Sequence, residues 1–380
     1  MKVLKNAQYP NLAQLTIVIP SFCREEYLLR QIVYWAFTDA TIIIADGSPV
    51  SLDSQVIELI SGIKNIQYFH MVDSYTHRIR ESCNRITTPY AMCLADDDLF
   101  LKEGLCSAVD RLNEDIDIAV CMGQVIGIEY DEKKMRTYLF PYGDSLENYH
   151  VTHQNPLKRI QLGIDNYRTA TSYAVFRSST FKDVWNSMQM TSCLEATEYE
   201  HAILTYACGN LSTVSNTYWL RSFECEPVDS VIDGTRKTTF DNWWKAQEYQ
   251  QECEAFINRL SFKLSQAIGT SEDNARREIF RVIDYILSGR HIGLMNRNLS
   301  IMALASVLKI VKRFTFLHKC FLRFRISNLG TILRNTVMAS ARGAENASES
   351  IVKFGVTDQA SLELKSVVSF VSSFQAAKNA

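Results

Sequence analysis

The sequence predicts an α/β protein with a mostly parallel, Rossmann-like sheet in its N-terminal part and a helical C-terminal region. Over the first 130 residues, short apolar runs alternate with amphipathic segments, as in a parallel sheet covered by helices on both faces. Beyond residue 240, long helical patterns replace the strand-like runs. The 380 residues exceed what one hydrophobic core usually holds. We therefore expect an N-terminal domain at 1–225, a helical region at 226–343, and a tail at 344–380 that is a weak helix or partly mobile.

The strands and helices expected in the N-terminal part alternate. β-Branched and other apolar residues concentrate in the predicted strands, at 15–20, 41–45, 66–71, 90–94 and 118–128. Helical spacing of apolar residues predicts helices at 25–37, 52–62, 77–86 and 105–113. Ligands of such sheets bind at the carboxyl ends of the strands, so the polar residues directly after each strand are the candidates for a site.

The later elements are expected to be more varied. A stretch rich in Tyr, His, Asn and Asp at 129–166 predicts an irregular region. A further strand is predicted at 171–176, and a helix at 195–207 begins with acidic residues, which the helix dipole favours. Long helices are predicted at 240–268 and 272–287.

Composition and charge narrow the classes of function. The chain is 47% hydrophobic and 22% charged, as in an ordinary soluble protein, and its net charge of -2 argues against a nucleic-acid binder. Ten cysteines occur without a Cys-x-x-Cys pair, which suits free thiols in a reducing cytoplasm. Cys93, Cys121 and Cys208 lie in apolar runs, where buried thiols are expected. Because the first residues form no apolar leader core and no run reaches about 18 apolar residues, we expect a cytoplasmic protein, with the inner face of the cell membrane as an alternative location.

The sharpest feature is the run of Asp96, Asp97 and Asp98 after the strand predicted at 90–94. Adjacent carboxylates repel one another, so a compensating cation is expected. Mg²⁺ or Mn²⁺ prefers oxygen ligands and keeps positions open for phosphate oxygens. Residues two apart in an extended segment point the same way, which favours Asp96 and Asp98 as metal ligands. The alternative is a solvated acidic turn in which Asp98 caps the following helix.

Two further groups of polar residues are candidates. Asp46 follows the strand at 41–45, where its carboxylate would accept from a base or a ribose hydroxyl. The alternative is a turn, since Asp-Gly-Ser is good turn chemistry. Residues 76–85 carry three arginines and an asparagine. Arg80 and Asn84 share one face of the predicted helix and are favoured to bind phosphate or base, with a solvated basic face as the alternative.

Glycine-rich phosphate loops are absent from the sequence. No Gly-x-Gly-x-x-Gly or Walker-type pattern follows any predicted strand. Dinucleotide-binding and ATP-binding proteins of this fold class use such loops to hold phosphate groups. The sequence therefore argues against both classes.

Four segments in order resemble the family 2 glycosyltransferases of the GT-A fold: 17–24 (IVIPSFCR), 45–48 (ADGS), 88–90 (TPY) and 95–98 (ADDD). The match is closest to a bacterial subgroup associated with surface polysaccharide synthesis, and it covers about the first 225 residues. The resemblance implies a nucleotide-sugar donor, most commonly a UDP-sugar, and a glycan or lipid-linked acceptor. It also implies an Asp-x-Asp metal site and an inverting displacement with a catalytic carboxylate late in the domain.

The family pattern assigns roles to residues of this chain. It places Pro20 and Ser21 at the nucleotide, Asp46 near the base or ribose, and Asp96 and Asp98 at the metal and diphosphate, with Asp97 as a further donor-binding residue. Which two of the three aspartates coordinate the metal stays open, because the acidic run of the family often begins one residue earlier. The chain departs from the pattern at three positions: Cys23 stands where many relatives carry Asn, Ala45 where many have an acidic residue, and Ala95 where the acidic run often begins.

The catalytic base implied by the resemblance comes from another segment. Residues 195–201 (EATEYEH) resemble the Glu-Asp segment that begins a helix in this family. An inverting transfer needs a carboxylate that takes the proton of the acceptor hydroxyl. Glu198 is the first choice and Glu200 the second, because Tyr199 stands where an Asp is expected. The alternative is that these acidic residues only favour a helix N-terminus, and His201 is either a metal or supporting group or a structural histidine.

A basic segment lies near the C-terminus. Between Asp284 and Glu345 there are ten Lys or Arg and no acidic residue. On a helix from Ala303 to Arg325, five basic residues would share one face and apolar residues the other, as in a helix bound at an anionic membrane surface. The alternative is a helix docked on the N-terminal domain with its lysines in water.

Three functions remain open from the sequence. The first is an active glycosyltransferase. The second is a catalytically silent relative that acts as a binding or assembly subunit in polysaccharide synthesis. A nucleotidyltransferase is less favoured, because residues 21–24 do not form the Gly-rich basic loop that such an enzyme needs after its first strand.

Overall fold

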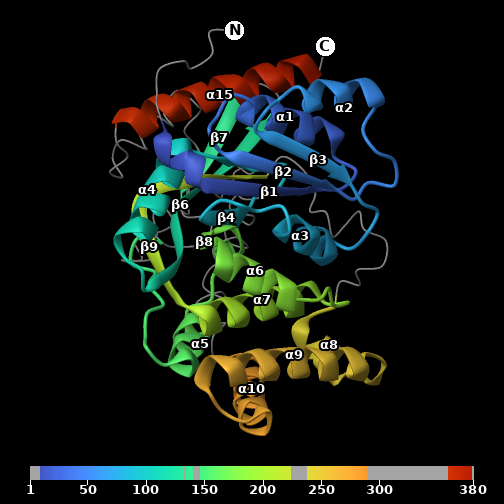
Figure 1. Cartoon of the computed structure of the whole chain (residues 1–380), viewed down its shortest axis with the longest axis vertical. Coiled ribbons are helices and arrows are strands. Elements are labelled where there is room, and N and C mark those ends of the chain that lie inside the picture. Colours follow the sequence, from blue (N-terminus) through green and yellow to red (C-terminus); the bar gives the residue numbers. More distant parts are fainter. Residues whose placement is uncertain (1–8, 132–133, 140–145, 224–237, 290–357, 379–380) are drawn as a thin grey trace, which may run out of the picture.

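The computed structural model of the chain describes residues 9–131, 134–139, 146–223, 238–289 and 358–378. Within these ranges the protein combines a mixed sheet, helices on both of its faces and a helical region beyond them (Figure 1). The predicted α/β class and the helical C-terminal region are therefore confirmed. The predicted membrane-surface helix from Ala303 to Arg325 lies outside the described residues.

The sheet has the strand order β3-β2-β1-β4-β8-β6-β9-β5, and β7 pairs with β6 at the side. The strands are β1 (Leu15–Ser21), β2 (Thr41–Asp46), β3 (Ile66–His70), β4 (Tyr90–Cys93), β5 (Leu99–Phe100), β6 (Ile118–Asp131), β7 (Lys134–Leu139), β8 (Val175–Arg177) and β9 (Asn210–Ser222). Strands β3, β2, β1 and β4 are mutually parallel, and so are β6 and β9, while β8 runs antiparallel between β4 and β6. The carboxyl ends of β1, β2 and β4 therefore share one edge.

The N-terminal strands follow from their apolar sequences. Every residue of β1 and β4 is buried, and in β2 only the first residue is partly exposed. Burial on both faces explains the nearly continuous apolar runs that predicted these strands. The register pairs Ser21 with Asp46 across β1 and β2, so the residues that end these two strands lie side by side.

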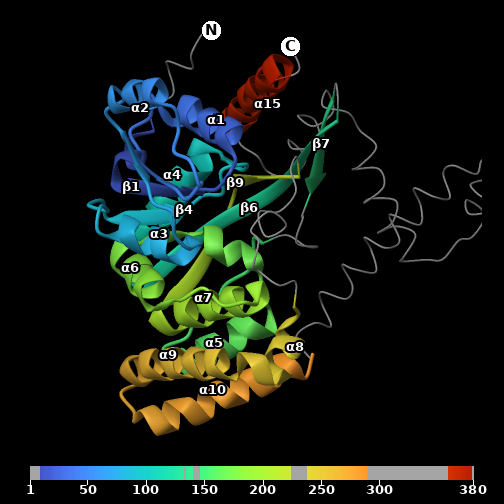
Figure 2. The same ribbon diagram turned by 90° about the vertical axis from the view of Figure 1, so that its right-hand side faces the viewer.

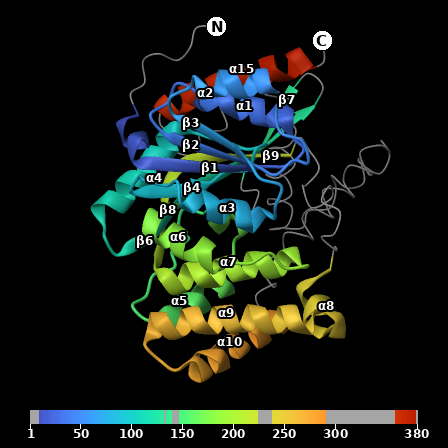
Figure 3. The ribbon, with the colours of Figure 1, turned by 45° about the vertical axis from the view of Figure 1, so that its right-hand side comes forward.

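Helices lie on both sides of the parallel strands. On one side are α1 (Glu25–Trp35) and α2 (Ser54–Ser61), and on the other are α3 (Tyr75–Cys83) and α6 (Ser178–Ser187) (Figure 1, Figure 3). The remaining elements of this part are α4 (Lys102–Glu114), α5 (Pro156–Asp165), α7 (Leu194–Cys208) and the 3-10 helices Pro10–Gln14 and Thr169–Tyr173. Of these, α4 packs against β6 and β9, and α7 packs against α5 and α6.

Two predictions about the middle of the chain were wrong. Residues 129–166 contain β7, which pairs back onto β6, and α5, so this stretch is more regular than expected. Asn155 caps α5 by accepting from the N–H of Leu157, and Pro156 occupies the first turn, a start signal that the polar composition concealed. The strand predicted at 171–176 is displaced, since residues 169–173 form a 3-10 helix and β8 begins at Val175.

The helical region stacks beyond α7 (Figure 2). The single helix predicted at 240–268 is divided into α8 (Phe240–Lys245), a 3-10 helix (Gln247–Tyr249) and α9 (Gln250–Ile268), because Ala246 is extended. Trp243 is fully buried, and its indole N–H donates to Glu252 on α9 at 3.0 Å, which holds the bend. Gly269 ends α9 in the left-handed conformation (φ 66°), and α10 (Glu272–Leu287) packs back against α9.

The last described helix, α15 (Asp358–Lys378), packs onto the N-terminal part of the chain (Figure 1, Figure 2). Its apolar residues join a separate buried cluster made of Leu99, Leu101, Ile126, Ile128, Leu220, Leu364, Val367 and Val371. Glu363 is 4% exposed, and its carboxylate accepts from the backbone N–H groups of Lys102 and Glu103 at 2.8 and 3.2 Å. A helix from the predicted tail thus caps α4, the helix that follows the aspartate run.

The described residues add two observations on the class of protein. None of their helices combines the length and the apolar content needed to cross a bilayer. Their cysteines are free thiols, with Cys93 and Cys121 buried as expected and Cys208 partly exposed.

Candidate functional site

The site begins where β1 ends. Pro20 and Ser21 are the last two residues of β1, and Cys23 follows with a φ of 54°, in a left-handed region that Asn enters more readily than most side chains. Cys23 therefore carries a local backbone strain at this turn. The N–H of Cys23 donates to Ser48 Oγ at 2.9 Å, which ties this turn to the one after β2.

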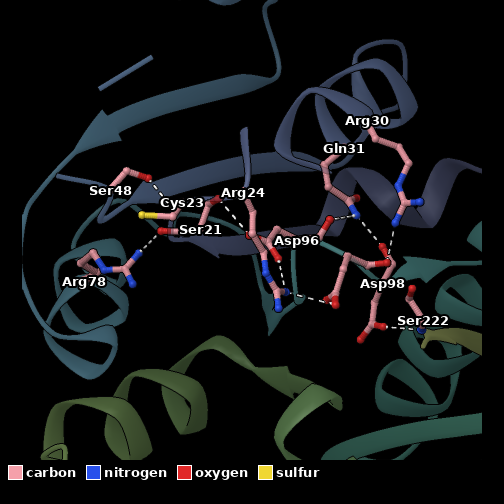
Figure 4. Close-up of polar contacts among 11 residues, drawn as sticks. Ser21, Cys23, Arg24, Arg30, Gln31, Ser48, Arg78, Asp96, Asp98 and Ser222 are labelled. Carbon is pink, nitrogen blue, oxygen red and sulfur yellow. Dashed lines mark hydrogen bonds and ion pairs between the residues drawn. The ribbon is translucent and has the colours of Figure 1, made fainter. Parts of the chain in front are cut away.

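The aspartate run lies directly beside this turn (Figure 4). Asp96 is 3% exposed and accepts from Ser21 Oγ at 2.9 Å and from Arg24 Nη1 at 3.1 Å. The same nitrogen of Arg24 lies 3.1 Å from Asp97 Oδ2. In this structure the guanidinium of Arg24 therefore provides a positive charge for the adjacent carboxylates.

Burial changes the ionisation of two of the three aspartates. It raises the pKa of Asp96 to about 6, with the charge of Asp97 adding to the rise while Arg24 and Ser21 oppose it. Burial also raises the pKa of Asp98 well above its usual range, again with a contribution from Asp97. A nearby cation stabilises the charged form of such carboxylates, so both groups favour the arrival of a positive charge.

Two side chains of helix α1 hydrogen-bond to the backbone of the aspartate run. The amide of Gln31, which is fully buried, donates to the carbonyl oxygen of Asp96 at 2.9 Å and to that of Asp98. Arg30, also fully buried, donates to the carbonyl oxygen of Asp97 at 2.5 Å. Neither contact could be predicted from local sequence pattern, because the partners of Arg30 and Gln31 lie 65 to 67 residues away.

The carboxylate of Asp98 has a different partner from those of Asp96 and Asp97. Its Oδ1 accepts from the backbone N–H of Ser222, at the end of β9, at 2.7 Å (Figure 4). The helix-capping alternative for Asp98 is contradicted, because the first N–H groups of α4 bond to Glu363 instead. The pairing of Asp96 with Asp98 at one metal remains a prediction, whereas the two carboxylates that share a cationic group here are Asp96 and Asp97.

The residues present fit a hard divalent cation. Asp96 Oδ1 and Asp97 Oδ2 both lie 3.1 Å from one nitrogen of Arg24, so two carboxylates converge on a position that suits a positive charge. Across the described ranges, no three His, Cys, Asp or Glu side chains are grouped as a metal site. Mg²⁺ is commonly held by one or two carboxylates together with phosphate oxygens and water. The geometry therefore suits a cation that arrives with a phosphate ligand.

Asp46 ends β2 at the same edge, but its carboxylate is already bonded. It is 1% exposed, and Oδ1 accepts from the N–H and Oγ of Ser48 at 2.9 and 2.6 Å. Oδ2 accepts from Tyr68 Oη at 2.8 Å, and burial raises the pKa of Tyr68 to about 12. The turn expected as the alternative for Asp46 is present, and contact with a base or ribose remains a prediction.

Arg78 reaches the strand edge from α3. It is 2% exposed, and its Nη1 donates to the carbonyl oxygens of Ser21 at 2.7 Å and Ala45 at 2.5 Å. Figure 4 shows the bond to Ser21, and with the second bond to Ala45 the guanidinium ties the ends of β1 and β2 together. A Cβ atom on Gly47 would lie 2.5 Å from this guanidinium, so glycine is needed at position 47 for Arg78 to approach.

The favoured pair on this helix, Arg80 and Asn84, has other partners. Arg80 donates to the backbone oxygen of Met188 at the end of α6. Asn84 is exposed and donates to Glu81 at 3.5 Å. Since α3 runs from the carboxyl end of β3 back to the start of β4, its last residues lie toward the opposite edge of the sheet. Arg78, rather than this pair, is the residue of α3 that the structure brings to the site.

Glu198 on α7 influences the ionisation of two buried tyrosines. Burial raises the pKa of Tyr75, and the charge of Glu198 adds to the rise while Arg78 opposes it. Glu198 also adds to the rise in the pKa of Tyr167, which burial dominates. Tyr167 is 8% exposed, and its hydroxyl has no hydrogen-bond partner among the described residues. Glu198 therefore lies within electrostatic range of Tyr75, the first residue of α3, and of Tyr167, and its role as the base remains a prediction.

Two further candidates on α7 are buried in its packing. Glu200 is fully buried and forms a two-point ion pair with Arg259 of α9, at 2.6 and 3.1 Å. Burial raises the pKa of Glu200 to about 7, and Arg259 opposes the rise. This carboxylate joins two helices, so we do not retain it as a base. His201 lies between Phe176 and Trp185, with ring centroids 5.9 and 5.0 Å away, and burial lowers its pKa to about 3, which indicates a neutral, structural histidine.

No family model matches the chain, and no curated protein matches it in sequence. Solved structures of S. aureus TarS resemble it in part. TarS residues 1–349 have a TM-score of 0.42 and 14% identity over 74% of this chain and 92% of that one. The same fragment with UDP-GlcNAc has a TM-score of 0.41 and 12% identity over equal shares. At these values the likeness carries no assignment of function.

Proposed function

We propose that this chain is a glycosyltransferase that moves a sugar from a nucleotide-sugar donor to a glycan or lipid-linked acceptor. The observation that carries the proposal is the meeting of Asp46, Arg78 and Asp96 at the carboxyl ends of neighbouring parallel strands. Ligands of α/β sheets bind at this edge. The motifs that resemble family 2 glycosyltransferases contribute Asp46 and Asp96, so sequence and geometry support the same donor site.

The proposed reaction assigns one step to each group. A divalent ion, Mg²⁺ or Mn²⁺, held by Asp96 and Asp97 would stabilise the negative charge of the departing diphosphate. Glu198 takes the proton of the acceptor hydroxyl, whose oxygen bonds to the anomeric carbon as the bond from that carbon to the diphosphate breaks. Attack on the face opposite the diphosphate inverts the anomeric configuration. Gln31 and Arg78 keep the aspartate run and the strand ends in place, which preserves the alignment of the reacting groups.

A ligand screen tests this function. Thermal unfolding would be followed with UDP-, GDP- and dTDP-sugars, each with and without Mn²⁺, because a ligand that binds only the folded state stabilises it. We expect sugars of a single nucleotide to raise the melting temperature when Mn²⁺ is present, and UDP is the nucleotide that we expect. The matching donor should then release its nucleoside diphosphate when an acceptor glycan is added. Absence of stabilisation by every nucleotide sugar would count against the proposal.

We also propose that the acceptor is presented at a membrane surface. The basic segment from Ala303 to Arg325 supports this location, since each basic residue near an anionic surface contributes about 1 kcal/mol. The protein should cosediment with anionic liposomes at low salt and be released at high salt. A protein that ignores anionic liposomes at low salt would instead use this segment as a docked helix.

The second candidate is a binding or assembly subunit without turnover. It is favoured because the carboxylates of Asp46 and Glu200 already accept hydrogen bonds from other side chains of this protein. Such a subunit would bind the nucleotide sugar yet release no nucleoside diphosphate with any acceptor, and the substitution Glu198→Gln would leave its binding unchanged.

A further inference from the structure

Arg24 holds the position at which a donor-bound cation is expected. Its Nη1 lies 3.1 Å from Asp96 Oδ1 and 3.1 Å from Asp97 Oδ2, and its side chain is 11% exposed. Arg78 and Arg221 lie within electrostatic range of Asp96 and Asp98, but Arg24 is the cation in direct contact with the carboxylates of Asp96 and Asp97. A divalent cation that binds these two carboxylates must therefore displace Arg24.

The backbone position of Arg24 allows its side chain to move. Arg24 is the N-cap of α1, with φ −134° and ψ 47°, and it follows the left-handed Cys23. It lies between β1 and α1, so reorienting its side chain breaks no strand pairing and no helical hydrogen bond. Arg30 and Arg78 differ, because both are nearly fully buried and donate to backbone carbonyl groups. Among these three arginines, Arg24 is the one whose contacts are the carboxylates that a metal would use.

We propose that Arg24 competes with the divalent cation for Asp96 and Asp97, and that the donor relieves this competition by accepting the displaced guanidinium on its diphosphate. The inference rests on the proposed function and adds to it a residue that couples metal binding to donor binding. Arginine binds phosphate oxygens as readily as carboxylates, with the same forked geometry. The cation alone then binds weakly, and cation and donor each raise the affinity for the other.

Binding of Mn²⁺ without nucleotide tests the competition. The EPR signal of free Mn²⁺ would give the affinity of the wild type, of Arg24→Gln and of a control, Arg281→Gln, which removes an equal charge from a side chain that is 72% exposed on α10. Arg24→Gln should bind Mn²⁺ about tenfold or more tightly than the wild type, because its competitor is gone, while the control should match the wild type. Equal Mn²⁺ affinity for Arg24→Gln and the wild type would overturn the proposal.

Binding of UDP tests the second contact of Arg24. With Mn²⁺ saturating, calorimetry should find that Arg24→Gln binds UDP about tenfold or more weakly than the wild type. One substitution would then change the two affinities in opposite directions, which a purely structural role of Arg24 would not produce. Unchanged UDP affinity would overturn the transfer of the guanidinium to the diphosphate. Circular dichroism and the melting temperature report whether each variant is folded.

These measurements separate the role of Arg24 from the proposed function. If the wild type binds UDP with Mn²⁺ and Arg24→Gln changes neither affinity, the role of Arg24 fails alone. If the wild type binds neither Mn²⁺ nor UDP, the donor site itself fails, and the inference fails with it.

Discussion

Replacing Glu363 by alanine tests whether α15 completes the fold around the aspartate run. The carboxylate of Glu363 accepts from the backbone N–H groups of Lys102 and Glu103 at 2.8 and 3.2 Å. These groups belong to the first turn of α4, where helix N–H groups have no partner within the helix. The N-cap residue, Leu101, has a side chain that cannot accept a hydrogen bond. The cap therefore comes from a residue about 260 positions away.

The expected destabilisation follows from these contacts. Losing a capping oxygen costs about 1 kcal/mol and at most about 2, and a negative charge at the helix N-terminus contributes roughly 0.3–1 kcal/mol more. Burial raises the pKa of Glu363, so the desolvation of the charged form offsets part of this gain. We expect Glu363→Ala to lower the free energy of unfolding by about 2 kcal/mol, and Glu363→Gln, which keeps one acceptor oxygen, to lower it by about 1 kcal/mol.

Two measurements read out this change. Urea unfolding followed by circular dichroism gives the free energy of unfolding, and hydrogen exchange of a peptide spanning residues 99–106 reports on the first turn of α4. The matched control is Lys365→Ala, which changes an exposed side chain on the same helix and should have an effect below about 0.5 kcal/mol. If Glu363→Ala destabilises no more than Lys365→Ala, and exchange at 99–106 is unchanged, the reasoning about this cap is refuted.

Three further predictions concern α7 and the strand edge. Glu198→Gln should lower kcat by about 10²-fold or more with donor affinity nearly unchanged, and a normal kcat would remove Glu198 as the base. Burial raises the pKa of Glu200 from 4.5 to about 7 in the folded state, so its contribution to stability is present below pH 4.5 and is lost as the pH rises through about 7. Glu200→Gln should therefore flatten the pH dependence of the free energy of unfolding in that interval, and an unaltered dependence would contradict this account. Gly47→Ala places a Cβ atom 2.5 Å from the guanidinium of Arg78, so it should cost about 1–3 kcal/mol of stability and weaken nucleotide binding, whereas wild-type values of both would show that Arg78 is free to shift.

The sequence predicted the parallel strands well because their signal is local. Strands β1, β2 and β4 are buried on both faces, and this burial requires a continuous apolar run that can be recognised without knowing the partners. The aspartate run was recognisable for a similar reason, since three adjacent carboxylates are unusual at the end of an apolar strand. Strand β9 was missed because its first half alternates apolar residues with Asn, Ser and Thr, which resembles a loop.

The supporting residues of the site were not predictable from local pattern. In the sequence, Gln31 is one polar residue of an amphipathic helix. In the structure it is fully buried and donates hydrogen bonds to the carbonyl oxygens of Asp96 and Asp98. Arg80 and Arg78 are two residues apart in one helix, and the choice between them depends on which side faces β1 and β2. That orientation is set by the packing of α3 on the sheet, which the spacing of charged residues does not report.

The central claim is that Asp96 helps to bind a nucleotide diphosphate through a divalent cation. Calorimetric titration of UDP into the wild type, Asp96→Asn and the exposed control Asp39→Asn, each with Mn²⁺ and with excess EDTA, tests it directly. We predict that Mn²⁺ raises UDP affinity about tenfold or more in the wild type and in Asp39→Asn, and that Asp96→Asn loses this increase. UDP affinity that is equal in Mn²⁺ and in EDTA for the wild type, or an increase that survives in Asp96→Asn, would contradict the account.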